Sequence, residues 1–206
     1  MAAAYDFVYF DLDDTLLDHR SAEQNALADL HSELSTQLES ALPFSVAQLQ
    51  HEYHESNVEL WRRYSLAEIT ADQLRHDRFA TVLFRHGLSL DPMQVSRRYM
   101  ECYATHWSTL PGATEAFDTI AQKNQVGIIT NGFASTQREK LERFASFRDA
   151  SAAIVISEEF GHMKPSRKLF DHASAQSGCS GERILYVGDS WHSDVEGGLN
   201  AGWSVA

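Results

Sequence analysis

The sequence predicts an α/β protein with a parallel-sheet core and an all-helical segment inserted after the first strand. Three observations predict this class: a short buried strand comes first, a long stretch of helical pattern follows, and strands then alternate with helices. Strands that alternate with helices form a parallel sheet with right-handed crossovers. The predicted division is 1–17 and 108–206 for the α/β core and 18–107 for the helical segment.

The first predicted strand contains Val8, Tyr9 and Phe10, whose β-branched and aromatic side chains fit a buried, pleated strand. Asp11 and Asp13 then crowd together where the strand should end. Folding gains nothing from packing like charges side by side, so the cluster implies a bound cation. Oxygen ligands favour a hard ion, and Mg2+ is therefore predicted before Zn2+.

The inserted segment has helical periodicity throughout. Leucines at spacings of three and four residues predict an amphipathic helix over 21–40. Ser45 and Thr70 are the predicted N-caps of the next two helices, and Gly87 ends the second of these. A last helix is predicted over 91–106, so the segment contains no strand.

Polar clusters follow the predicted strands of the second half of the chain. Thr130 and Asn131 end one strand, Asp189 and Asp194 follow another, and Lys164 comes a short loop after a third. In open parallel sheets, ligands bind beyond the carboxyl ends of the strands, so these side chains are expected at one site with Asp11. The predicted strands are 125–130, 152–157 and 183–187, and the predicted helices are 113–123, 135–147 and 166–176.

Composition excludes several classes of protein. A formal charge of -12 disfavours binding to a nucleic-acid polymer, which needs a basic face. No apolar stretch approaches the ~20 residues that span a bilayer, and the N-terminus lacks the pattern of a secretory leader. Cys102 and Cys179 are far apart and are expected to be free thiols in a reducing cytoplasm. Nothing in the sequence indicates the oligomeric state.

The predicted site has the groups needed for phosphoryl transfer. Carboxylates from different strands could hold one Mg2+, while Asp11 could attack an electrophile and Asp13 could act as general acid and base. Thr130 and the backbone N–H groups around Asn131 could bind anionic oxygens, and Lys164 could neutralise charge. Phosphoryl transfer needs the in-line positioning and charge neutralisation that these groups can supply. The expected partner is therefore a small phosphorylated metabolite.

Four motifs occur in order: DLDDTL at 11–16, TNG at 130–132, KP at 164–165, and GDS followed by Asp194 in 188–194. In these motifs and their order, the chain resembles the haloacid dehalogenase (HAD) superfamily. The resemblance covers nearly the whole chain. It implies a Rossmann-like core and makes the inserted segment a helical cap over the active site.

The resemblance also implies a role for each motif residue. Asp11 would form an aspartyl-phosphate, and Asp13 would be the general acid and base, with its backbone carbonyl on Mg2+. The phosphate would lie against Thr130 and Lys164. Asp189 would be a metal ligand, and Asp194 would support the metal site.

Three further segments look like the branch of nucleoside 5'-monophosphatases that prefer pyrimidine nucleotides. They are 130–133, 157–161, and Ile69-Thr70 followed by Arg78-Phe79. The predicted function is accordingly a Mg2+-dependent phosphatase that hydrolyses a small phosphomonoester, with a nucleoside 5'-monophosphate as the candidate substrate.

Alternatives remain at this stage. A haloacid dehalogenase needs no metal and no general acid, and a phosphomutase would move phosphate between sugar hydroxyls. A third alternative is a non-catalytic binding protein, because the resemblance implies a further strand and helix whereas this sequence ends at Ala206. If those elements are missing, an apolar sheet edge is expected to be exposed or covered by a partner.

Other polar residues are assigned less specific roles. Glu158 is expected to be solvated or to cap a helix, with orientation of Lys164 as its alternative, and Trp191 and His192 add bulk to the fourth-motif loop. For most of one group in the helical segment, the favoured interpretation is a surface helix with Trp61 in the core of that segment, and nucleobase binding is the alternative. The group comprises His51, His54, Asn57, Trp61, Arg62 and Tyr64.

Overall fold

The computed structural model describes residues 5–206. Residues 1–4, on which the expectation of no secretory leader partly rests, lie outside the described residues. The chain forms two compact units, residues 5–19 with 108–206 and residues 20–107. The role of the second unit as a cap stays a prediction.

The first unit is built on a sheet in which every paired strand runs parallel, in the order β3-β2-β1-β4-β5. This arrangement confirms the predicted Rossmann-like α/β class. The strands are β1 (Phe7–Phe10), β2 (Gln125–Thr130), β3 (Ser151–Ile156), β4 (Ile184–Val187) and β5 (Ser204–Val205).

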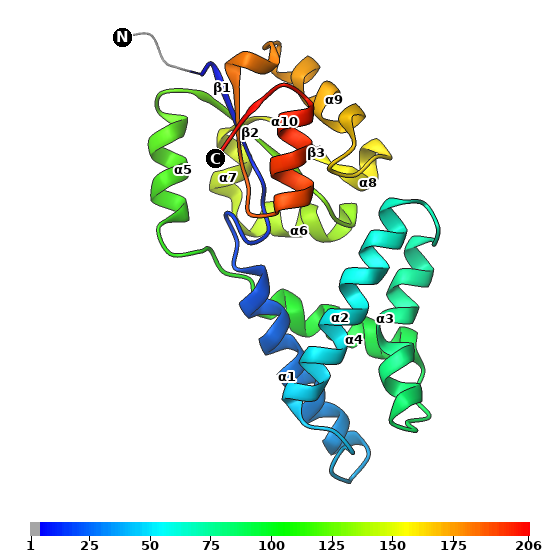
Figure 1. Cartoon of the computed structure of the whole chain (residues 1–206). Coiled ribbons are helices and arrows are strands. Elements are labelled where there is room, and N and C mark those ends of the chain that lie inside the picture. Colours follow the sequence, from blue (N-terminus) through cyan, green and yellow to red (C-terminus); the bar gives the residue numbers. More distant parts are fainter. Residues whose placement is uncertain (1–4) are drawn as a thin grey trace. The chain divides into compact units, whose positions relative to one another are not determined.

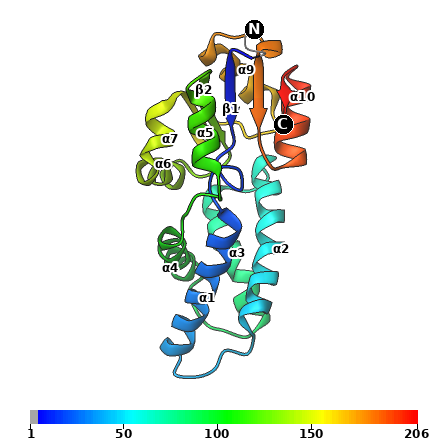
Figure 2. The same ribbon diagram turned by 90° about the vertical axis from the view of Figure 1, so that its left-hand side faces the viewer.

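Helices cover both faces of this sheet. Figures 1 and 2 show α5 and α7 on one face and α9 and α10 on the other. The α-helices are α5 (Ala113–Ala121), α6 (Ala134–Arg143), α7 (Ala145–Ala150), α8 (Ser157–Phe160), α9 (Arg167–Ser177) and α10 (Gly197–Asn200). Two further helical turns are η1 (Gly181–Arg183), which is a 3-10 turn, and η2 (Trp191–Glu196), which is a π-helical turn.

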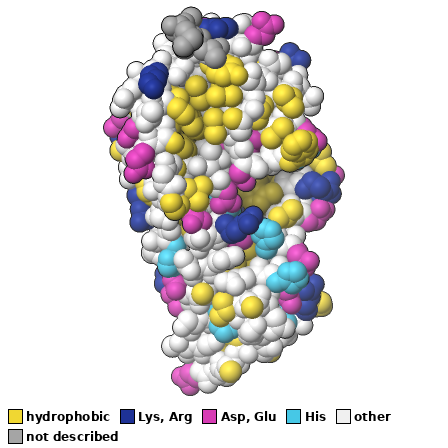
Figure 3. All heavy atoms as spheres, turned by 60° about the vertical axis from the view of Figure 1, so that its left-hand side comes forward, with side chains coloured by type: hydrophobic (Ala, Val, Ile, Leu, Met, Phe, Trp, Pro, Cys, Tyr) yellow, Lys and Arg dark blue, Asp and Glu magenta, His cyan; other side chains and the backbone are white. Residues whose placement is uncertain are grey.

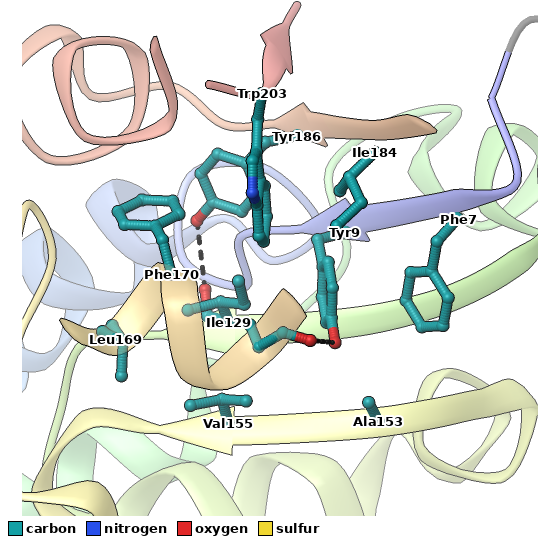
Figure 4. Close-up of a cluster of buried hydrophobic side chains, with 11 residues drawn as sticks. Phe7, Tyr9, Ile129, Ala153, Val155, Leu169, Phe170, Ile184, Tyr186 and Trp203 are labelled. Atoms are coloured by element: carbon teal, nitrogen blue, oxygen red, sulfur yellow. Dashed lines mark hydrogen bonds between the residues drawn. The ribbon is translucent and has the colours of Figure 1, made fainter. Parts of the chain in front are cut away.

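Each face of the sheet carries its own hydrophobic core. On the α9 side, Tyr9, Phe170 and Tyr186 are buried around Trp203, whose ring lies 5.4 Å from Tyr9 and 5.2 Å from Phe170 (Figure 4). The other core contains Phe10, Phe117, Leu141 and Phe147 among its buried residues. The alternation of side chains along the strands supplies both cores, because successive residues point to opposite faces.

The predicted single helix over 135–147 is wrong, because the structure has two helices that meet at Phe144. Leu141 and Phe147 both lie in the same core cluster. In one continuous helix these positions would be about 120° apart around the axis and would point in different directions. The break redirects the chain and lets both side chains be buried.

One side of β4 is less well covered than the other. Ile184 and Tyr186 are fully buried, whereas Leu185 and Val187 are only partly buried. Figure 3 shows hydrophobic side chains gathered on one face of the molecule. Part of the apolar side of the strand is therefore accessible to solvent.

The second unit is entirely helical over its described length, as predicted. Ser45 and Thr70 each accept a hydrogen bond from a backbone N–H three residues later, which confirms them as N-caps. Its α-helices are α1 (His19–Gln37, beginning one residue before the unit), α2 (Val46–Ser65), α3 (Ala71–Arg85) and α4 (Pro92–Thr105). Among the helices of residues 5–206, none is long and apolar enough to cross a membrane.

The core of the second unit is aromatic. Tyr53, Phe79 and Tyr99 are buried, with ring centroids 5.0–5.4 Å apart. The predicted group on α2 is divided: Asn57 is buried, whereas Trp61 is only partly buried. The favoured interpretation placed Trp61 in the core of this unit, and it is wrong on that point, because the helix packs on the side where Asn57 lies and Asn57 is the buried residue. Nucleobase binding by this group stays a prediction.

Candidate active site

The register of the sheet brings the predicted site residues together. Phe10 lies opposite Ile128 on one side and Val187 on the other. The chain therefore leaves β1 at Asp11 directly beside the loop that follows β4. Asp11 N–H donates to the carbonyl of Val187 over 2.8 Å and fixes this start of the loop. Because all these strands are parallel, their carboxyl ends lie along the same edge of the sheet.

Lys164 is the cation at the centre of the site and is 3% exposed. Its Nζ lies 2.7 Å from Asp11 Oδ1 and 2.7 Å from Asp194 Oδ1. The ammonium also donates to Tyr186 Oη over 2.7 Å. Burial alone would lower the pKa of Lys164, but the two carboxylates outweigh this effect and raise it. The side chain is therefore held as a cation with three acceptors for its three N–H groups.

The main chain of Lys164 is fixed by Asn131. Lys164 N–H donates to Asn131 Oδ1 over 2.9 Å, and Asn131 Nδ2 donates to the Lys164 carbonyl over 3.1 Å. This side chain thus positions the lysine loop, while the predicted role of the surrounding N–H groups in phosphate binding stays a prediction. Glu158 instead accepts from Ala134 N–H at the start of α6, so its predicted capping role is confirmed.

Three carboxylates form a candidate metal centre. One oxygen from each of Asp11, Asp189 and Asp194 lies within 4.8 Å of the other two. Asp194 is fully buried, and its Oδ2 accepts from Ser190 N–H over 3.0 Å. A Cβ added to Gly188 would lie 2.5 Å from the same oxygen, so glycine is required for this close approach.

The negative charges of two of these carboxylates, Asp11 and Asp189, are not fully compensated by their surroundings. Burial, opposed by Lys164, raises the pKa of Asp11 above its ordinary value. Although Asp189 is an exposed residue, partial shielding of its carboxyl group and then the charge of Asp194 raise its pKa. A cluster that disfavours its own ionisation and offers only oxygen ligands fits a hard divalent cation.

Asp13 lies in a different environment. Its Oδ1 is 2.6 Å from Lys140 Nζ, and its Oδ2 accepts from Gln137 Nε2 over 3.0 Å. Burial would raise the pKa of Asp13, but Lys140, together with His19 and Gln137, outweighs burial and lowers it. The sequence prediction did not include Lys140 and Gln137. A usable signal was present, because both share one helical face with buried Leu141.

Thr130 is also hydrogen-bonded to Gln137, which contacts Asp13. It is fully buried, and its Oγ1 accepts from the same Gln137 Nε2. Gln137 therefore links Asp13 to Thr130, the residue predicted to contact phosphate. Direct binding of phosphate by Thr130 stays a prediction.

The two bulky residues of the fourth-motif loop are exposed. Trp191 Nε1 donates to Glu196 Oε1 over 3.2 Å, and His192 Nδ1 lies 2.8 Å from Glu196 Oε2. Trp191 is 70% exposed. Both side chains are thus joined to Glu196 within the π-helical turn.

The fold and site therefore combine an open parallel α/β sheet with a buried Asp–Lys pair and an acidic cluster at its carboxyl edge. Residues 5–202 match the haloacid dehalogenase-like hydrolase family, and the chain belongs to that family. The match confirms the resemblance stated from the motifs.

Relatives within the family include nucleotidases and sugar phosphatases. The chain is 36% identical to pyrimidine 5'-nucleotidase YjjG of Escherichia coli (strain K12) over 201 residues, which covers 96% of this chain and 83% of that protein. It is 30% identical over 202 residues to glyceraldehyde 3-phosphate phosphatase of Methanopyrus kandleri, with 95% and 80% coverage.

Solved structures share the same architecture. The crystal structure of the putative HAD-hydrolase YfnB from Bacillus subtilis, bound to magnesium, matches with a TM-score of 0.83 and 28% identity. The match covers 98% of this chain and 86% of that one.

Proposed function

We propose that this chain is a Mg2+-dependent phosphatase that hydrolyses a small phosphomonoester through an aspartyl-phosphate. The observation that carries the proposal is the cluster formed by Asp11, Asp189 and Asp194, with Lys164 bonded to two of its members. The nucleotidases and sugar phosphatases among the relatives support a small phosphorylated substrate. A nucleoside 5'-monophosphate is the first substrate class to test.

In the first half-reaction, an oxygen of Asp11 forms a bond to phosphorus while the bond from phosphorus to the leaving oxygen breaks. Lys140 and Gln137 favour the carboxylate form of Asp13, so Asp13 must take up a proton before this step. It then gives that proton to the leaving oxygen. Lys164 keeps Asp11 oriented and offsets part of the negative charge. Thr130 and the N–H groups near Asn131 are proposed to bind the phosphoryl oxygens.

In the second half-reaction, a water molecule attacks phosphorus and Asp13 takes its proton. The bond between Asp11 and phosphorus breaks, which releases inorganic phosphate and restores the carboxylate. Asp11, Asp189 and the backbone carbonyl of Asp13 would hold Mg2+, with Asp194 beside them. When bound, this ion supplies positive charge that neutralises the phosphoryl group.

The test is phosphate release from a panel of phosphomonoesters, including pyrimidine and purine monophosphates, with Mg2+ and with EDTA. Asp11→Asn should lower kcat by at least about 10³-fold without unfolding the protein, because the nucleophile is lost. Asp6→Asn is the matched control, since Asp6 pairs with Arg183 on the surface. Full Mg2+-dependent turnover by Asp11→Asn would refute the nucleophile assignment.

The same assay separates the alternatives. Halide release from a haloacid in EDTA would indicate a dehalogenase, and transfer between sugar hydroxyls without phosphate release would indicate a phosphomutase. If wild-type protein releases no phosphate from any substrate and Mg2+ does not raise its melting temperature, a non-catalytic binding protein is the better description.

A further inference from the structure

We infer that Lys140 and Gln137 are positioning residues that hold the carboxyl group of Asp13 in place for proton transfer. This inference rests on the proposed function, because it assumes that Asp13 is the general acid and base. It adds two residues of α6 that lie outside the four sequence motifs.

The contacts account for both oxygens of Asp13. Lys140 Nζ lies 2.6 Å from Oδ1, and Gln137 Nε2 donates to Oδ2 over 3.0 Å. Both donors are deeply buried, with Lys140 2% and Gln137 1% exposed. Two bonds to different oxygens fix the plane of a carboxyl group, whereas a single bond leaves it free to rotate. The orientation of Asp13 is thus set by α6.

The helix that carries these donors is itself anchored. At its start, Gly132 N–H donates to Ser157 Oγ over 3.1 Å and Ala134 N–H donates to Glu158 over 2.7 Å. On its buried side, Leu141 is 1% exposed within the hydrophobic core. Supporting contacts of this kind are what hold a catalytic group to the narrow geometry that proton transfer requires.

Stability alone is a poor explanation for this arrangement. Taking an ammonium and a carboxylate out of water costs about as much as their attraction returns, so a buried ion pair is weak evidence of stabilisation. Gln137 additionally joins Asp13 to Thr130, the residue proposed to contact phosphate. The three side chains therefore connect the proton-transfer group with the phosphoryl site.

The test compares two substrates whose leaving groups differ in their need for a proton. A nucleoside 5'-monophosphate releases a basic alkoxide that must be protonated, whereas p-nitrophenyl phosphate releases a stable phenolate. Lys140→Met should lower kcat/KM about 100-fold for the nucleotide and less than about 10-fold for p-nitrophenyl phosphate, because general acid catalysis contributes on this scale. Gln137→Met should likewise lower kcat/KM more for the nucleotide than for p-nitrophenyl phosphate.

Arg138→Met is the matched control, because it removes a cation from the same helix whose partner is the surface residue Glu159. It should leave both kcat/KM values within about 2-fold of wild type, as expected when an exposed pair is removed. Thermal unfolding of each variant identifies loss of fold. If Lys140→Met does not fold, the decision rests on Gln137→Met.

A double-mutant cycle shows whether Lys140 acts through Asp13. In an Asp13→Asn background, Lys140→Met should produce no further loss of kcat/KM, because the group that it positions is already absent. Equal losses for both substrates, or additive losses in the double mutant, would overturn the inference while leaving the phosphatase proposal intact. Failure of wild-type protein to hydrolyse either substrate would instead overturn the proposed function and this inference with it.

Discussion

At the scale of single residues, the candidate site is a set of charges that compensate one another only in part. Lys164 neutralises part of the charge on Asp11 and Asp194, and Tyr186 completes its set of acceptors. The same Tyr186 hydroxyl lies 3.1 Å from Asp194 Oδ1 and 3.2 Å from the Ile129 carbonyl. One hydroxyl thus connects the lysine, the acidic cluster and the sheet.

Replacing Tyr186 with Phe should destabilise the protein by about 1–3 kcal/mol, because it leaves a donor of buried Lys164 unsatisfied. It should also lower phosphatase activity, since Lys164 loses one of three fixed contacts. Denaturation in urea and a steady-state assay would measure the two effects.

Tyr9→Phe is the control, because the Tyr9 hydroxyl donates over 2.8 Å to the Ala173 carbonyl in the same core. It should cost about 1 kcal/mol, the typical value for one neutral hydrogen bond, and leave activity unchanged. Equal effects of the two variants on activity would contradict a special role for Tyr186.

At the scale of elements, α6 connects the 130–132 loop, Asp13 and the hydrophobic core. Its first turn follows the 130–132 loop, its buried face supplies Gln137 and Lys140, and Leu141 packs in the core. Glu158, at the start of α8, caps the N-terminal end of α6 by accepting a hydrogen bond from Ala134 N–H. A carboxylate at this end is favourable because it meets unpaired N–H groups and the positive end of the helix dipole.

Glu158→Ala should therefore lower the free energy of unfolding by about 1 kcal/mol, as expected for loss of a capping side chain. The neighbouring substitution Glu159→Ala should cost less than about 0.5 kcal/mol, because it removes an exposed pair with Arg138. Urea midpoints at constant m-value would provide the comparison. A larger loss for Glu159→Ala would show that the cap contributes little.

At the scale of the whole molecule, the proposed metal binding at the acidic cluster would be coupled to folding. Its carboxylates come from segments far apart in the sequence, so the complete site exists only in the folded chain. A ligand that binds the folded state alone stabilises it by about 2.7 kcal/mol at 100 times its Kd. Mg2+ should therefore raise the melting temperature, and EDTA should reverse the shift.

Asp189→Asn provides the control for this effect, because it removes one charged ligand of the cluster at an exposed position. The variant should need a higher Mg2+ concentration for the same shift in melting temperature. An unchanged response to Mg2+ in Asp189→Asn would show that the ion binds elsewhere.

The sequence alone determined the class of fold and predicted that four motifs lie at one site, but it did not predict Lys140, Gln137 or Tyr186 there. Hydrophobic periodicity is a local property, so the parallel sheet, the helical segment and the N-caps Ser45 and Thr70 could be predicted. The four motifs could be placed together because parallel strands present their carboxyl ends at one edge. This rule assigns residues to the site but not their partners.

Only the tertiary structure decided which groups contact one another. The break at Phe144 depends on how Leu141 and Phe147 reach one core, and β5 has only two residues, too few to form a readable pattern. The contact between Lys140 and Asp13 joins residues 127 positions apart. Pairings over such separations depend on packing between elements, and local preferences along the chain contain no record of them.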